Sequence, residues 1–489
     1  MNTEPIITNE RVDDIPVLLR QLERMGVKEL IDKHFPKHGN WEGESLGSIA
    51  IIWLTHILSQ ADHRLNHVQG WVAKRLEILK MFAGETLKEL DLTDDRLQSL
   101  LRYLDRDKNW KPFEAELSGN IIQVYDLNPE KVRLDSTTAS SHCGINSEGL
   151  FQFGHSKDHR PDLAQVKIML STLDPLGMPI ATEILPGNKA DDPLYIPAIN
   201  QVRLTIQKSG LLYIGDCKMA SIATRTHIAL GQDFYLCPLS AKHVTQEEIG
   251  EYLQEVWDGK QQLTTIDYDY SDGNNKQIAV RAASRREGFE RELAQTIKVD
   301  AQEFTWNERQ LIVRSFAMAE TEEKSLRARL QKTSNALEAL NKTRRGKKKL
   351  TNVDQWSTSI AAILKRYRTD GLFRINLQVT KHQKTTRKYL DRLPQTREST
   401  SINLDFEILE SAVTQQIKLL GWRVYVTNQT SSLLSLKQAV RCYRDEYLAE
   451  RRFARIKGFP LSLTPIYLQR EDHITGKIAY FQMGKRVLT

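Results

Sequence analysis

The chain has 489 residues, of which 40% are hydrophobic and 27% charged, and its formal net charge is +7. This composition is ordinary for a globular protein and excludes a low-complexity or collagen-like chain. The longest apolar stretch, residues 46–58, is shorter than the roughly 20 residues that span a bilayer. Because the N-terminus also lacks a signal pattern, the sequence predicts a cytoplasmic protein without a membrane partner.

Basic residues gather in three segments, residues 341–350, 381–388 and 450–458. Each segment alone is typical of a solvated face, but the three together favour a nucleic-acid partner. The four cysteines are far apart and form no CxxC pair, so neither a zinc site nor a disulfide framework is indicated.

Residues 1–128 have the pattern of a helical N-terminal domain. Ile49, Ile52 and Trp53 recur at helical spacing, and Gly and Pro are sparse. A Thr-Asp capping signal opens the segment that begins at Thr93.

Near residue 129 the residue pattern changes to one that is typical of a mixed α/β core. Strands are expected first, then helices and strands alternate, which favours a central mixed sheet flanked by helices. The expected strands are 131–137, 164–174, 177–185, 211–216 and 234–239, and the expected helices are 191–207 and 219–230.

We expect this core to be interrupted by an inserted α+β subdomain over residues 241–430. Helices are expected at 321–342 and 353–368, and strands at 372–380 and 421–429. The first part of the core is then 129–240, and residues 431–489 form its final helix and tail.

Three acids are candidates for a common site. Asp135 and Asp216 end two expected core strands, and Glu450 lies among Arg residues on the late helix. Each Asp alone is commonly a turn residue or a helix cap. Three carboxylates at one sheet edge, however, suit Mg²⁺, and two such ions can drive in-line displacement at a phosphodiester.

This arrangement resembles the RNase H-like fold of DDE transposases, in particular a bacterial insertion-sequence group with a Tyr-Arg-Glu-Lys signature. Tyr443, Glu450 and Lys457 fall on the signature positions, and segments 149–180 and 187–196 also resemble members of the group. The resemblance implies cleavage and strand transfer at the terminal inverted repeats of an insertion sequence. It also implies that Mg²⁺, or Mn²⁺ in its place, is bound by the three acids named above.

The resemblance also indicates which residues contact DNA. Glu446 occupies the group's Arg position, so Arg444 or Arg452 is expected to substitute for it. The turn-rich segment after the first acid is expected to contact DNA or to be an ordinary exposed hairpin. Trp422 is expected either to stack on a flipped base or to pack as a core aromatic. The DNA-contacting candidates are Tyr443, Lys457, Arg444, Arg452, Trp422, His155, Lys157 and Arg160.

The expected partners are the transposon ends, target DNA and a second copy of the chain on paired ends. The N-terminal domain would bind end DNA or support dimerisation. One alternative is a catalytically impaired or repurposed transposase-derived protein that binds DNA. A free-standing nuclease would share the acids but gives no reason for the helical N-terminal domain. Intact inverted repeats around the gene would favour the enzyme, and their absence would favour the impaired or repurposed protein.

Overall fold

The computed structural model describes residues 9–145, 148–266, 285–299, 302–342, 352–385, 396–444 and 456–489. Two compact units are present. Unit 1 contains Met1–Leu239, Glu292–Gln310 and Tyr425–Thr489, and unit 2 contains Ser240–Arg291 and Leu311–Val424. Among the described helices, none combines the length and apolar character required to cross a membrane.

The N-terminal part of unit 1 is helical, as the sequence predicts. The helix α3 (Leu46–Gln60) begins at Ser45, whose side chain accepts a hydrogen bond from the Ser48 amide. Every residue of this helix from Leu46 to Leu58 is buried. The sequence pattern had indicated one buried face only. The other helices are α1 (Ile15–Arg24), α2 (Val27–His34), α4 (Leu65–Ala73), α5 (Leu76–Ala83), α6 (Asp94–Leu104) and α7 (Asp107–Val124), with the 3-10 turn η1 (Glu89–Leu92).

One cause of this burial is a C-terminal helix that the sequence reading did not anticipate, α17 (Glu471–Val487). It packs against α6 and β3, and Tyr480 stacks on Trp53 of α3 with ring centroids 4.5 Å apart. The core of unit 1 is therefore continuous from the N-terminal helices through the sheet to α17.

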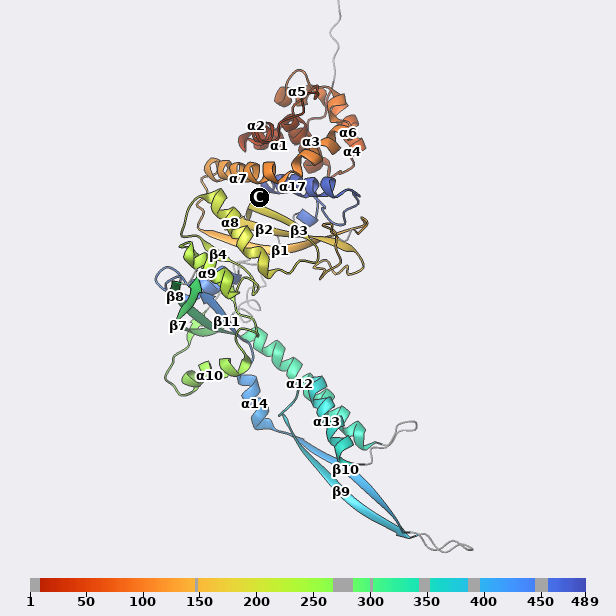
Figure 1. The fold of residues 1–489 in the computed structure, drawn as a ribbon, viewed down its shortest axis with the longest axis vertical. Coiled ribbons are helices and arrows are strands. Elements are labelled where there is room, and N and C mark those ends of the chain that lie inside the picture. The colour runs from red at the N-terminus through yellow and green to blue at the C-terminus, as the bar shows by residue number, and fades with distance from the viewer. Residues whose placement is uncertain are drawn as a thin grey trace, which may run out of the picture. The chain divides into compact units, whose positions relative to one another are not determined.

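The sheet begins with the order β3-β2-β1-β4-β5. Its strands are β1 (Lys131–Ser141), β2 (Ala164–Leu173), β3 (Met178–Pro186), β4 (Leu212–Ile214) and β5 (Phe234–Pro238). The first three strands pair antiparallel, whereas β4 pairs parallel with both β1 and β5. This order and these directions confirm the RNase H-like mixed sheet. The helices α7, α17 and α8 (Tyr195–Ile206) all contact β3, as Figure 1 shows, and α9 (Ile222–Leu230) packs on β5.

The sheet continues from β5 through β11 (Trp422–Thr427), β8 (Gln302–Ser315) and β7 (Arg286–Val299). Tyr425 pairs with Pro238 although the two are far apart in the sequence. Buried Glu308 of β8 accepts hydrogen bonds from Arg225 and from the Tyr235 hydroxyl, which fastens this strand to α9 and β5. The helix α15 (Leu436–Arg444) follows β11 in the chain.

Unit 2 has its own core between two helices and a two-stranded ribbon. The helix α12 (Phe316–Asn341) buries Leu326, Leu330 and Leu337 on the stripe that the sequence predicts. These residues share a core with α13 (Val353–Tyr367) and with the ribbon of β9 (Phe373–Thr385) and β10 (Thr396–Ile408). The remaining elements are α10 (Gln246–Trp257), β6 (Thr264–Ile266), which pairs with the start of β7, and α14 (Glu410–Lys418). The segments 262–273 and 276–284, which the sequence predicts to form a hairpin, lie mostly outside the described residues.

Candidate active site

Asp135 and Asp216 occupy matching positions on two neighbouring parallel strands. The last paired residues of β1 and β4 are Arg133 and Ile214, and each Asp follows its strand's last pair by two residues. A side chain at Gly215 would meet Met219 Sδ at 2.8 Å, so the glycine leaves room for Met219. The expectation that Asp135 ends its strand was wrong, because pairing with β2 carries β1 on to Ser141, and only the parallel pairing with β4 ends before Asp135. The carboxyl end of such a parallel pair is where α/β proteins commonly bind ligands.

Asp216 is held by two donors. The hydroxyl of Tyr195, on α8, donates to Asp216 Oδ1 at 2.6 Å, and the Lys218 amide donates to the same oxygen at 2.8 Å. Burial, followed by the charge of Asp216, raises the pKa of Tyr195 well above its ordinary value. Tyr195 therefore stays protonated and acts as a fixed donor to this carboxylate.

Asp135 lies in a less favourable environment for its charge. Burial raises the pKa of Asp135 to about 6, the Asp216 carboxylate adds to the rise, and Lys157 opposes it. Lys157 Nζ lies 3.5 Å from Asp135 Oδ1, and the Ser136 amide donates to that oxygen at 2.7 Å. The two acids are thus close enough to repel each other and only partly compensated.

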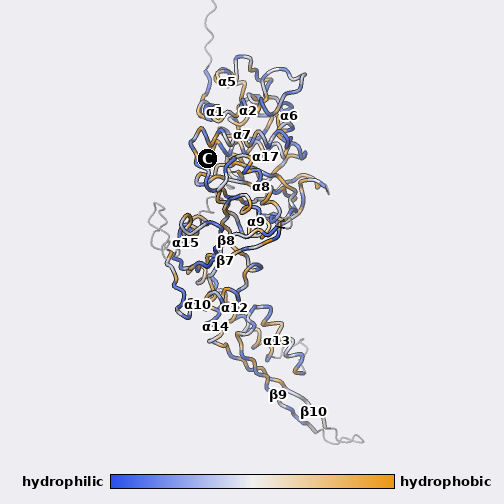
Figure 2. The backbone as a smooth tube through the Cα atoms, turned by 60° about the vertical axis from the view of Figure 1, so that its left-hand side comes forward, coloured by the Kyte–Doolittle hydropathy of each residue, from blue (hydrophilic) through white to orange (hydrophobic). Residues whose placement is uncertain are grey.

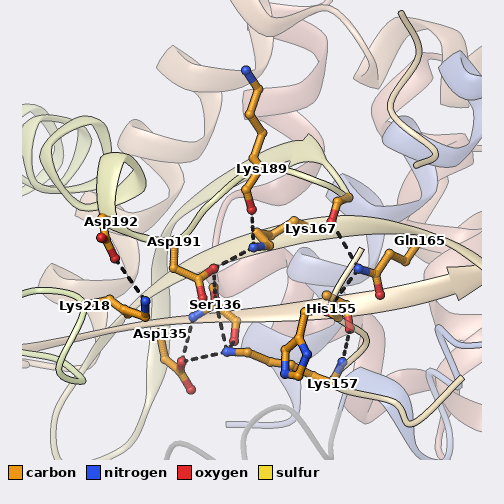
Figure 3. A network of polar contacts seen from close by, with 12 residues as sticks. Asp135, Ser136, His155, Lys157, Gln165, Lys167, Lys189, Asp191, Asp192 and Lys218 are labelled. Atoms are coloured by element: carbon orange, nitrogen blue, oxygen red, sulfur yellow. Dashed lines mark hydrogen bonds and ion pairs between the residues drawn. The ribbon is translucent and has the colours of Figure 1, made fainter. Parts of the chain in front are cut away.

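A polar network extends from Asp135 into the sheet (Figure 3). Lys157 Nζ donates to Ser136 Oγ at 3.0 Å, and that hydroxyl donates to Asp191 Oδ1 at 3.1 Å. Buried Lys167 also donates to Asp191 Oδ1, at 2.7 Å. Burial works to raise the pKa of Asp191, but the Lys167 hydrogen bond and the charges of Lys167 and Lys157 outweigh it and leave that pKa lowered. The network fixes the ammonium of Lys157 beside Asp135.

Sequence reasoning missed both Lys167 and Asp191. A signal for Lys167 was present, since a single Lys interrupts the apolar run of β2 from Val166 to Leu170. A Lys is rarely buried in a strand without an acid to pair with, so this position could have prompted a search for a carboxylate. Asp191 lies in the segment 187–196, which had been noted for its resemblance and as the start of the expected helix 191–207, but not as part of the site.

Residues 134–479 match the family described as Transposase DDE domain. The chain belongs to this transposase family. Among solved structures, it is similar to the piggyBac transposase in a synaptic complex with hairpin DNA, at 10% sequence identity and a TM-score of 0.27. That similarity covers 62% of this chain and 58% of the other, little more than half of its length. No curated protein matches the chain.

The three DNA-contacting candidates of the transposase that follow Asp135 are His155, Lys157 and Arg160, and the structure places them in different surroundings. Lys157 belongs to the network beside Asp135 (Figure 3), and exposed His155 accepts a hydrogen bond from Gln165 at its carbonyl oxygen. Arg160 is exposed and pairs with Asp162, with Nη2 and Oδ2 2.8 Å apart. Of these three residues, the structure places only Lys157 beside Asp135 of β1.

Two signature residues of the transposase, Tyr443 and Lys457, are among the described residues, and they lie on either side of the undescribed residues 445–455. Tyr443 packs on Tyr425 with ring centroids 4.9 Å apart, and Arg444 is exposed. Lys457 forms an ion pair with Asp158, whose carboxylate also accepts a hydrogen bond from the Ser140 amide at 3.3 Å. Glu450, Arg452 and Glu446 lie outside the described residues.

Trp422 belongs to unit 2. Its side chain is buried, its indole Nε1 donates to the Lys418 carbonyl oxygen at 3.0 Å, and its ring meets Phe289 edge-on at 6.5 Å. These contacts are those of a packed aromatic residue in the conformation described here.

The donor chemistry of the site fits a hard divalent cation, the kind of cofactor that DDE transposases use. Asp135 and Asp216 offer carboxylate oxygens, the ligands that Mg²⁺ prefers, and their mutual repulsion favours binding of a cation. Within the described ranges no group of three His, Cys, Asp or Glu residues could hold a metal ion.

Proposed function

We propose that this chain is an active transposase that cuts DNA at the terminal inverted repeats of an insertion sequence and transfers the cut strand to target DNA. The observation that carries the proposal is the matched placement of Asp135 and Asp216, each two residues past the last residue by which β1 and β4 pair in parallel. The match to the Transposase DDE domain, which spans both acids, supports it.

The proposed metal ligands are Asp135, Asp216 and Glu450, and the proposed ion is Mg²⁺, with Mn²⁺ able to substitute. A divalent pair supplies activation of water or a 3′-hydroxyl and stabilises the leaving oxygen. The protein's part is to orient the ligands. Tyr195 fixes the Asp216 carboxylate by its hydrogen bond, while Lys157 balances part of the negative charge at Asp135.

DNA contacts are proposed for the signature helix and for the segment after β1. Basic side chains near an acidic site counter its repulsion of the phosphate backbone. The residues proposed for this role are Tyr443, Arg444, Arg452, Lys457, His155, Lys157 and Arg160, and Trp422 is proposed to stack on a flipped base. We further propose a homodimer on paired ends, acting in the cytosol at the nucleoid.

The test is cleavage of duplex DNA that carries the sequences flanking the gene, with Mg²⁺ or Mn²⁺ added. Asp135→Ala, Asp216→Ala and Glu450→Ala should each abolish nicking and leave binding of the same DNA intact. Asp192→Ala is the matched control, because Asp192 is exposed and only faces Lys218 at 3.6 Å. Nicking by any of the three catalytic-site variants at the wild-type rate would remove that residue from the site.

A second candidate is a transposase-derived protein that binds DNA without cutting it. Glu446 favours it, since an acid at the group's Arg position repels a phosphate. In that case the wild-type protein would bind end DNA without nicking it, even with Mn²⁺, and Glu446→Arg would restore nicking.

A further inference from the structure

The ribbon formed by β9 and β10 has an inner half that packs and an outer half that does not. Its two strands pair in unbroken register from Phe373 with Ile408 to Thr385 with Thr396. Near the base, Phe373 and Leu404 are buried in the core of unit 2. Figure 2 traces β9 and β10 with hydrophobic and hydrophilic residues alternating in this inner half.

Beyond Leu377 and Leu404 the ribbon is largely exposed, although Ser401 and Ile402 are half-buried and Ile402 still packs against the core of unit 2. Every residue of β9 from Gln378 to Gln383 is exposed, including Val379 at 46%. On β10, Thr400 and Asn403 are exposed as well. A two-stranded ribbon with neither face covered is marginally stable in water. The pairing therefore continues well past the hydrophobic core that stabilises its base.

The residue types of the outer half are those that hydrogen-bond to nucleic acid. Gln378 lies opposite Asn403, and Lys381 lies opposite Thr400. His382 hydrogen-bonds to Ser401 Oγ at 3.2 Å. The segment 378–385 contains no Asp or Glu and enters the basic segment that begins at Lys381, whereas the facing segment 396–403 contains one base, Arg397, and one acid, Glu398.

We propose that the outer half of the ribbon, residues 378–385 with 396–403, lies in the major groove of duplex DNA and reads its sequence. The identity of that DNA as the transposon end rests on the proposed function. Eight residues of a strand span about 26 Å, and a major groove about 12 Å wide admits a two-stranded ribbon. The amides of Gln378 and Asn403 suit the paired donor and acceptor of adenine, and Lys381 suits guanine or a phosphate.

The register provides a direct test in the full chain. Leu377 and Leu404 face each other on one rung, so replacing residues 378–403 by Asn-Gly closes a two-residue hairpin and keeps the buried base. The shortened protein should melt at the wild-type temperature. Its affinity for duplex DNA carrying the flanking ends should fall at least tenfold relative to its affinity for a scrambled duplex.

Point variants guard against a folding defect in the shortened protein. Gln378→Ala with Asn403→Ala should lower the same affinity ratio roughly five- to 150-fold, since a bidentate contact contributes about 1–3 kcal/mol of discrimination. The matched control is Gln331→Ala with Asn335→Ala, an amide pair on the exposed face of α12, and it should change nothing. Protection of guanine N7 from methylation should weaken in the shortened protein, which also lacks Lys381.

The readouts separate this inference from the proposed function. If the ribbon variants retain wild-type affinity ratios and methylation protection, the ribbon does not read DNA, whatever the chain cleaves. A ribbon that instead joins two copies of the chain would lower the sedimentation mass of the shortened protein without changing its DNA affinity, and this result also overturns the inference. Absence of nicking by a wild-type protein that binds end DNA bears only on the proposed catalysis.

Discussion

Arg133 of β1 donates a hydrogen bond from Nη2 to the carbonyl oxygen of Cys442 on α15, 2.7 Å away. The same guanidinium forms a buried ion pair with Asp174, with Nη2 2.7 Å from Oδ2. Arg133 precedes Asp135 by two residues on the same strand, and Cys442 precedes Glu450 by eight residues in the chain. Arg133 therefore links β1, which contains Asp135, to α15, the helix that precedes Glu450 in the chain.

Arg133→Lys should lower the rate of strand nicking about ten- to hundred-fold, because an ammonium cannot bind Asp174 and Cys442 with the geometry of a planar fork. The concentration of Mn²⁺ needed for half-maximal nicking should rise at the same time, which a purely structural defect would not cause. Asp174→Asn is the comparison, since it keeps the bond to Cys442. Equal Mn²⁺ requirements in wild type and Arg133→Lys would show that Arg133 only stabilises the fold.

Asp135→Asn should raise the melting temperature of the metal-free protein by a few degrees above pH 6. The pKa of Asp135 is raised from 3.8 to about 6, so the folded state binds its proton more tightly than the unfolded state. The wild type therefore loses stability as the pH rises from about 4 to about 6, and the variant does not. Scanning calorimetry in EDTA should show no difference at pH 3.5.

The same pair of proteins tests metal binding without any cleavage assay. Mg²⁺ should raise the melting temperature of the wild type at pH 8 and have little effect on Asp135→Asn, because binding to the folded state stabilises it. Equal responses of both proteins would contradict a role for Asp135 as a metal ligand.

Tyr195→Phe should slow nicking about ten-fold or more and leave DNA affinity unchanged. The variant keeps the buried ring and removes only the hydroxyl that orients Asp216. Partners that orient a metal ligand typically matter by ten- to hundred-fold. Steady-state nicking at varied Mn²⁺ concentration measures the effect. The control is Tyr103→Phe, since the Tyr103 hydroxyl accepts from the His38 amide among the N-terminal helices.

Neutralising Lys157 and Arg160 together should shallow the salt dependence of end-DNA binding by about one to two units of log–log slope. Arg160→Gln alone should account for about one unit if its exposed guanidinium exchanges Asp162 for a phosphate. Lys260→Gln is the control, because Lys260 is exposed in unit 2 and pairs with Asp258. An unchanged slope in the double variant would support the alternative of an ordinary exposed hairpin.

The sheet was predictable because its signals are local. The apolar strands follow each other in the sequence, and the parallel pairing of β1 with β4 brings Asp135 beside Asp216, although β1 continues past Asp135 to Ser141. The network of Lys167, Ser136 and Asp191 was not predictable in the same way, because it depends on register between strands and loops.

The missed elements have physical reasons as well. The outer parts of β9 and β10 are mostly polar and lack the alternation that marks a half-buried strand, whereas the inner half of β10 alternates from Ile402 to Ile408, a signal that sequence reasoning overlooked. The helix α17 contains two Gly residues and buries Lys485 and Arg486, features that argue against a helix in sequence. Gly476 is required there, since a side chain would meet the Leu101 carbonyl oxygen at 2.1 Å.

The fully buried ion pair of α17 also bears on how the chain folds. Arg486 Nη2 lies 3.0 Å from Glu114 Oε1, and neither side chain is exposed. The two residues are 372 positions apart in the sequence, so this contact forms only after a very large loop has closed. Until then Glu114 would be buried without its cation, a state that costs several kcal/mol. The N-terminal helices and the sheet should therefore unfold and refold in one cooperative transition, and a fragment ending before Glu471 should populate a loosely packed intermediate that aggregates.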